Sequence, residues 1–158
     1  MKQIRKHNLI LLLLTAVLIG CGDKPLFEKV YSFDGRTWTL DQKPEFTLEV
    51  RDTTALYDIS LTLRTTTDYK FNNLWIFLNT TLPDRQSERR PYQIRISKED
   101  GAWLGKKTGS IVETSLDFPS LKLPLSGKYS FIVEQAITQS QVDEVLDIGL
   151  RVKKTELP

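Results

Sequence analysis

The stretch LDIGLRVK, residues 146–153, has an apolar side chain at every second position. Successive side chains of a β-strand point to opposite faces of its sheet, so this spacing predicts a strand with one face in a core and the other in water. The same alternation recurs in four earlier segments, at 46–51, 59–64, 92–97 and 129–133. Repeated half-buried strands of this kind predict an all-β domain.

The segment 73–81 differs because residues Leu74 to Leu78 are apolar on both faces. Such a run predicts a central strand, or a strand whose second face is covered by a loop, and we expect Trp75 within it to be a core residue. Residues 27–33 and 109–116 are weaker strand candidates.

Turn-forming pairs separate these segments, among them Asp34-Gly35, Asp100-Gly101 and Ser126-Gly127. The one helix start signal, Ser140 followed by Asp143, leaves room for no more than a turn. About eight short strands joined by regular turns predict a single antiparallel β-sandwich, of the jelly-roll or immunoglobulin-like type, over residues 27–158.

The first twenty residues have the pattern of an export signal. Met1 to His7 is basic, and Leu9 to Ile19 is apolar apart from Thr15. This run is shorter than the roughly 20 residues that a transmembrane helix needs, and it matches a secretory signal peptide. We therefore expect residues 1–20 to be removed.

The end of this signal resembles a bacterial lipobox, with Leu18, Ile19 and Gly20 directly before Cys21. In that motif the cysteine is diacylated and becomes the new N-terminus, and two or more acyl chains give stable anchoring. The alternative is an ordinary signal peptide that ends near a cysteine. We expect lipidation of Cys21, with residues 21–26 as a tether short enough to hold the domain close to the bilayer.

The residues after Cys21 bear on sorting. Gly22 stands where an aspartate marks inner-membrane retention in some bacteria, and residues 22–25 lack a dense acidic run that would resemble a surface-export tag. We therefore expect an outer-membrane lipoprotein on the periplasmic face.

The rare residue types limit the chemistry of the chain. His, Cys and Met occur once each, as His7, Cys21 and Met1. Removal of residues 1–20 leaves no His, no Met and no Cys beyond the first residue, Cys21, which we expect to be acylated. This excludes imidazole bases, His or thiolate zinc sites, haem ligation and a cysteine nucleophile. The leader also removes three of the 22 basic side chains, so 19 basic and 20 acidic side chains remain. We expect no metal, no cofactor and no nucleic-acid partner.

Carboxylates are the remaining catalytic candidates. Glu99-Asp100 and Asp143-Glu144 could contribute to a glycosidase pair, which needs two carboxyl groups facing each other across a cleft. The side chains of neighbouring residues on a turn usually point apart, so a hydrolase is the weakest candidate function, behind binding of a protein partner and binding of a glycan. The sequence predicts a protein that is not an enzyme.

Two basic segments and one tryptophan are candidate contact residues. Arg85, Arg89 and Arg90 fall in one segment and Lys106-Lys107 in another. Each segment is either a solvated loop or a docking patch for an anionic partner. Trp103 follows a turn, which makes it the best exposed candidate of the three tryptophans for stacking on a sugar, although core packing is commoner for Trp.

Taken in order, many of these pieces are similar to one known family. The residues that carry the similarity are Trp38, Asp52, Tyr57-Asp58-Ile59, Arg64, Tyr69, Asn73-Leu74-Trp75-Ile76-Phe77, Asp100-Gly101-Ala102-Trp103-Leu104-Gly105, Gly127-Lys128-Tyr129-Ser130-Phe131, Gln135-Ala136 and Asp147-Ile148-Gly149-Leu150-Arg151-Val152. In this order, behind a lipobox, they resemble the gliding motility lipoprotein GldH family. The family pattern continues with Met and Arg after Gln135-Ala136, where this chain has Ile137 and Thr138.

The resemblance implies a small outer-membrane lipoprotein needed for gliding and linked to the associated protein secretion machinery. It implies partners among other gliding or secretion lipoproteins, or among envelope proteins, and it carries over no catalytic residue. The alternative function is a glycan-binding β-sandwich lipoprotein.

Overall fold

The computed structural model describes residues 24–155. These residues form eleven strands and one short 3-10 turn, η2 (Asp34–Arg36). The eight longer strands are β1 (Phe27–Ser32), β3 (Glu45–Val50), β4 (Leu56–Thr66), β5 (Asn73–Thr81), β6 (Ser87–Arg95), β8 (Ile111–Lys122), β9 (Gly127–Gln135) and β11 (Val145–Lys154). The three short strands are β2 (Thr37–Thr39), β7 (Lys106–Thr108) and β10 (Gln141–Asp143). Within this part of the chain, no helix is long and apolar enough to cross a membrane.

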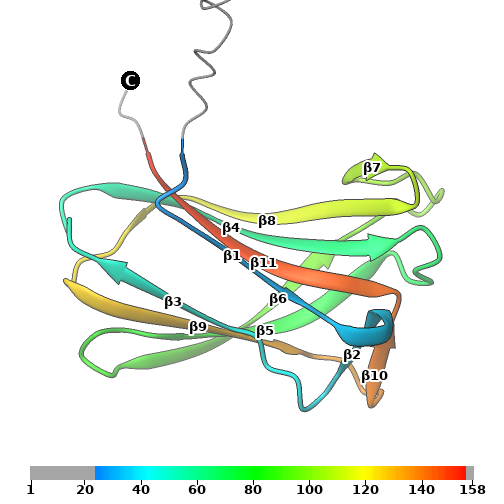
Figure 1. Ribbon diagram of the computed structural model, residues 1–158, viewed down its shortest axis with the longest axis horizontal. Helices are drawn as coiled ribbons and strands as arrows, with labels where there is room; N and C mark the ends of the chain where they lie inside the picture. Colours follow the sequence, from blue (N-terminus) through cyan, green and yellow to red (C-terminus); the bar gives the residue numbers. More distant parts are fainter. Residues whose placement is uncertain (1–23, 156–158) are drawn as a thin grey trace, which may run out of the picture.

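The longer strands pair antiparallel in two sheets that face each other (Figure 1). One sheet has the order β1-β11-β4-β8-β7 and the other the order β3-β9-β5-β6, while β2 and β10 pair with each other. Leaving out the three short strands, the orders are first-eighth-third-sixth and second-seventh-fourth-fifth, which is the jelly-roll arrangement. The predicted all-β antiparallel sandwich is confirmed, and of the two types expected it is the jelly roll.

Alternation along the strands builds the core. In β3, Phe46, Leu48 and Val50 are buried while the residues between them are exposed. The same period of two continues through β4, β9 and most of β11, so one face of every long inner strand lies between the sheets. These inward side chains bury the apolar area that stabilises the fold.

Strand β5 confirms one part of the prediction for 73–81 and contradicts another. It lies between β9 and β6, as expected for a central strand. Leu74, Ile76 and Leu78 point inward, so Trp75 and Phe77 take the outer face, and Trp75 is 43% exposed. The expectation that Trp75 belongs to the core was wrong because an apolar residue between two inward residues must point out of a strand.

The pair β2 and β10 closes one end of the sandwich. Trp38 of β2 is fully buried and stacks on Phe33, with ring centroids 4.9 Å apart. Its indole Nε1 donates to the carbonyl of Gln42 at 2.8 Å, and its own carbonyl accepts from Gln135 Nε2 at 3.0 Å. The indole N–H of Trp38 therefore has a hydrogen-bond acceptor although the ring is buried, as is usual for a buried Trp.

Both ends of the described chain leave the sandwich at its other end (Figure 1). Leu26 N donates to the carbonyl of Val152, and Thr155 N donates to the carbonyl of Leu56. We call this the proximal end, because the described chain begins and ends there. The end that carries β2 and β10 is the distal end.

Candidate functional site

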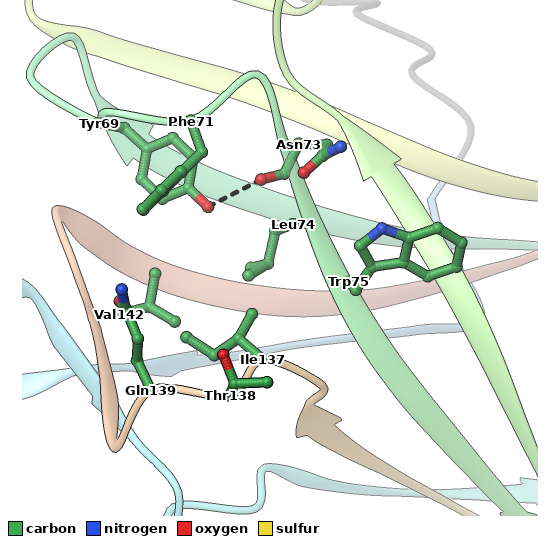
Figure 2. Close-up of a pocket in the computed structure, with 9 residues that line it drawn as sticks. All are labelled: Tyr69, Phe71, Asn73, Leu74, Trp75, Ile137, Thr138, Gln139 and Val142. Atoms are coloured by element: carbon green, nitrogen blue, oxygen red, sulfur yellow. Dashed lines mark hydrogen bonds between the residues drawn. The ribbon is translucent and has the colours of Figure 1, made fainter.

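A pocket of about 180 Å³ opens at the distal end of the sandwich (Figure 2). Its residues come from the loop before β5, the start of β5, the loop after β9, and β10. They are Tyr69, Phe71, Asn73, Leu74, Trp75, Ile137, Thr138, Gln139 and Val142. We call this the distal pocket.

Two aromatic rings form one wall of the distal pocket. Tyr69 and Phe71 meet edge to face, with centroids 5.8 Å apart and ring planes at 70°. The Tyr69 hydroxyl donates to the backbone carbonyl of Asn73 at 3.0 Å, and its burial raises the pKa of Tyr69. The hydroxyl therefore stays protonated, and it fixes the loop that presents Phe71, which is 50% exposed.

Trp75 lies on the opposite side of the pocket, with Leu74 between it and the Tyr69–Phe71 wall (Figure 2). Leu74 is buried, and with Val142 it supplies the apolar base of the site. Trp75 is exposed because its strand turns that side chain to the outer face. Two exposed aromatic side chains, Phe71 and Trp75, therefore flank one apolar depression.

The third side is the loop that joins β9 to β10. Ala136 N donates to the carbonyl of Trp75 at 2.9 Å, which holds the start of this loop against β5. Thr138 and Gln139 are exposed, and among the described residues neither side chain has a hydrogen-bond partner. Within residues 24–155, no charged residue lines the pocket. The site can therefore take an uncharged group with one apolar face and some hydrogen-bonding capacity.

The predicted basic residues of β6 are held by neighbouring side chains. The Arg89 guanidinium lies over the Phe77 ring, 3.4 Å from its centroid, and its Nη2 is 3.0 Å from Glu134 Oε2. Lys43 Nζ lies 3.0 Å from the same carboxylate. The hydrogen bond from Lys43, and to a smaller extent that from Arg89, lowers the pKa of Glu134. Arg90 pairs with Glu88 at 2.6 Å. These contacts cover Phe77 and leave Arg89 and Arg90 already paired.

The remaining predicted contact residues do not lie together. Arg85 is in the turn between β5 and β6 at the proximal end, whereas Lys106 and Lys107 form β7 at the distal end (Figure 1). Trp103 is half-buried, pairs with Ser97 through an isolated bridge and packs against the core. The expectation that Trp103 is the best exposed tryptophan was wrong, since its bridge turns the ring inward and Trp75 is the exposed one.

Three of the four candidate catalytic carboxylates stabilise local structure, and the fourth, Glu99, is exposed. Asp100 accepts the N–H of Ala102 within its own turn, and Asp143 accepts from the hydroxyl of Thr37. Glu144 accepts from the Thr66 hydroxyl at 2.5 Å and pairs with Arg36. Within residues 24–155, no group of three acidic side chains is placed to hold a metal ion.

The predicted lipidation site, Cys21, and the lipobox residues Leu18, Ile19 and Gly20 lie outside the described residues.

Phe71 was missed as a functional candidate by the sequence reasoning. The available signal was the alternation Tyr69-Lys70-Phe71 directly before a strand, combined with the inward positions of Leu74 and Ile76. That combination places Trp75 on the outer face of the sheet, across the pocket from Phe71. The loop 137–139, some sixty residues later, has no local pattern that would bring it to the same site.

Comparisons with known proteins agree over nearly the whole chain. The model of the family described as "GldH lipoprotein" matches residues 25–152. The chain is 24% identical to the "Gliding motility lipoprotein GldH homolog" of Christiangramia forsetii, over 94% of this chain and 96% of that protein. It is 27% identical to the "Gliding motility lipoprotein GldH" of Flavobacterium johnsoniae, over 96% of this chain and 98% of that protein.

Among solved structures, the chain has a TM-score of 0.36 and 12% identity to the infectious bursal disease virus VP2 subviral particle, covering 83% of this chain and 34% of that one. The family assignment rests on the sequence matches, which extend from the first strand to the last. The chain belongs to the GldH lipoprotein family.

Proposed function

We propose that this lipoprotein is anchored in the outer membrane through Cys21, on the periplasmic face. Removal of residues 1–20 would make Cys21 the first residue, and residues 21–26 would join the acyl chains to the sandwich that starts at Phe27. Each methylene buried in the bilayer contributes about 0.8 kcal/mol, so two or more chains hold the protein stably. Family membership supports the anchor, because the family is one of lipoproteins.

We infer that the protein works by binding, as an assembly component of gliding motility and of the secretion machinery linked to it. The observation that carries this role is the match to gliding motility lipoproteins over nearly the full chain. The candidate carboxylates support a role without catalysis, since Asp100, Asp143 and Glu144 are each engaged in local hydrogen bonds or ion pairs.

The distal pocket is the surface that we propose for the partner. It lies at the end of the sandwich opposite to the exit of the chain, so a protein tethered at Cys21 presents it away from the bilayer (Figure 1). Exposed aromatic side chains beside an apolar depression are typical of the anchor points of protein interfaces. Phe71 and Trp75 would flank an apolar side chain of another envelope protein.

A photo-crosslinking amino acid in place of Trp75 tests this role in the native membrane. We expect one dominant crosslinked product that contains a gliding or secretion component, identified by mass spectrometry. The same crosslinker in place of Tyr31, which is 37% exposed on β1, is the matched control. Equal products from both positions, or none from Trp75, would contradict the proposed interface.

The anchor has its own test. Replacement of Cys21 by Ala should release the protein from the membrane fraction with its fold intact, because residues 24–155 build the core without Cys21. Fractionation and circular dichroism measure the two outcomes. A mutant that stays in the membrane fraction would contradict anchoring through Cys21.

The distal pocket also supports the alternative function, binding of a neutral glycan. Its uncharged lining combines Phe71 and Trp75 with the side chains of Asn73, Thr138 and Gln139, which matches the apolar faces and hydroxyls of a sugar ring. Tryptophan fluorescence titration with neutral oligosaccharides separates the two functions. A saturable change that Trp75→Phe abolishes would favour the glycan, and no change would favour the protein partner.

A further inference from the structure

The sandwich is open along one flank, where the edge strand β6 faces the part of β8 that lies beyond its pairing with β7. A slot of about 300 Å³ lies between them, lined mainly by apolar side chains of both sheets. Tyr92 of β6 and Phe118 of β8 meet edge to face across it, with centroids 5.1 Å apart. We call this slot the open flank.

The inward side chains of the open flank are incompletely covered. Tyr92 and Phe118 have the inward register of their strands, yet both are only half-buried. Leu121, at the mouth of the slot, is 38% exposed. Apolar residues that point into a sandwich and still contact solvent indicate a surface that an apolar ligand could cover.

The two edges of this flank are poor templates for an added protein strand. Pro91 lies in the middle of β6 and Pro119 near the end of β8. Proline has no backbone N–H, so neither residue can donate to an incoming strand, and proline on an edge is a known protection against strand addition. An occupant that needs no backbone hydrogen bonds fits the slot better than a peptide does.

Strand register places the open flank near the membrane. Phe27 pairs with Val152, Val152 with Ile59, and Ile59 with Phe118. Neighbouring strands are about 4.8 Å apart, so Phe118 is roughly 14 Å from the first residue of β1. Residues 21–26 span at most about 3.6 Å each. The slot is therefore within reach of the bilayer surface in which Cys21 would be anchored.

The charge at the mouth also matches a phospholipid. Lys122 lines the slot beside Leu121, and among the described residues it forms no ion pair. Arg90, on the other edge, is already paired with Glu88. One free cation next to an apolar slot can meet the phosphate of a lipid whose acyl chain lies between the sheets.

We propose that the open flank binds one acyl chain of a membrane phospholipid, with Lys122 at the headgroup phosphate. This inference goes beyond the proposed partner binding and involves the other end of the sandwich. It does not depend on the identity of the distal partner.

The test uses the Cys21→Ala protein, which carries no acyl chain of its own. The probe is 1-palmitoyl-lysophosphatidylglycerol below its micelle concentration, and binding is measured by native mass spectrometry and by displacement of a fluorescent fatty acid. We expect one bound lipid per chain. Leu121→Asp should weaken binding by about tenfold or more, because a carboxylate then enters the apolar mouth and repels the headgroup phosphate. Leu40→Asp is the matched control, since Leu40 is 48% exposed on the turn after β2.

A second variant separates the headgroup contact from the slot and does not require a change in the apolar lining. Lys122→Glu should weaken binding of the anionic probe but leave binding of hexadecanol unchanged. The absence of lipid binding by the Cys21→Ala protein, or equal binding by Leu121→Asp, would overturn the proposal. Binding by Cys21→Ala but not by the native lipidated protein would also overturn it, since the slot would then hold the protein's own acyl chain.

Discussion

Arg64 on β4 and Asp147 on β11 form a bidentate ion pair on the outer face of the sheet that contains β1, β11, β4, β8 and β7. Arg64 Nε lies 2.8 Å from Asp147 Oδ1, and Nη2 lies 2.5 Å from Oδ2. The two residues are cross-strand partners just after the irregularity between Val145 and Asp147. The hydrogen bonds that Arg64 donates to Asp147 raise the pKa of Arg64. The pair therefore fixes the register of β11 directly after its bulge.

Arg64→Ala should lower the free energy of unfolding by about 1–3 kcal/mol, because it leaves the buried Asp147 carboxylate without its partner. Urea unfolding measures the change. Arg36→Ala is the control, since Arg36 is more exposed in its pair with Glu144, and we expect a loss of no more than about 1 kcal/mol there. Equal losses of unfolding free energy for both variants would show that the Arg64–Asp147 pair stabilises the protein no more than the exposed Arg36–Glu144 pair does.

Trp38 and Trp75 should differ strongly in their contribution to the stability of the protein and in their accessibility to a quencher. Trp38→Ala removes a fully buried ring and should cost about 3–5 kcal/mol. Trp75→Ala removes an exposed ring from the outer face and should change stability by about 0.5 kcal/mol or less. Urea unfolding measures both. Acrylamide should quench the emission that Trp75 contributes and leave that of Trp38 unaffected. Comparable losses of stability would contradict the placement of Trp75.

Much of the fold follows from local pattern. The period of two in 46–51, 59–64 and 146–153 predicted strands that the structure contains, with the expected inward residues. The short strands β2 and β10 were not predicted, because three residues are too few to establish a period. Strand order was also beyond the sequence, since β1 pairs with β11 from the opposite end of the chain.

The candidate site was less predictable than the fold. Hydrophobicity alone suggested that Trp75 is buried, although its position between Leu74 and Ile76 already implied the outer face. The distal pocket joins residues near position 70 to residues near position 140. Its assembly depends on the pairing of β5 with β9, which is a long-range contact that no local motif encodes.

Gly149 on β11 lies so close to Thr62 and Val30 that a side chain at this position would test the packing of the outer face. A Cβ added there would lie 2.7 Å from Thr62 Oγ1 and 3.2 Å from Val30 Cγ2. Gly149→Ala should therefore destabilise the protein by about 1–3 kcal/mol through overpacking between β11, β4 and β1.

Thr62→Ala removes the nearest of these atoms, so it should relieve part of the cost in a double-mutant cycle measured by urea unfolding. Thr62→Val keeps the volume at that position and is the matched control, which should give no relief. Additive effects for Gly149→Ala and Thr62→Ala would contradict crowding at this contact.

Asp52 links the turn after β3 to the last strand. Its Oδ1 accepts from the hydroxyl of Thr54 at 2.7 Å and from the N–H groups of Thr54 and Ala55, and its Oδ2 lies 2.9 Å from Lys154 Nζ. The Thr54 hydrogen bond, followed by Lys154, lowers the pKa of Asp52 well below its ordinary value of 3.8. The charged carboxylate is therefore favoured in the folded state.

A carboxyl whose pKa is lowered by folding adds to the free energy of unfolding. This stabilisation is fully present at a pH above the ordinary pKa and is lost as the pH falls through the pKa of the folded state. Asp52→Asn should therefore be less stable than the parent protein near neutral pH. The difference in urea midpoint should shrink as the pH falls below about 3.8, because protons then bind first to the Asp52 carboxyl of the unfolded chain and only at still lower pH to that of the folded protein. Asp68→Asn, at an exposed carboxylate, is the control and should leave the midpoint unchanged near neutral pH. A midpoint difference for Asp52→Asn that does not depend on pH would mean that the side chain acts through its shape and not through its charge.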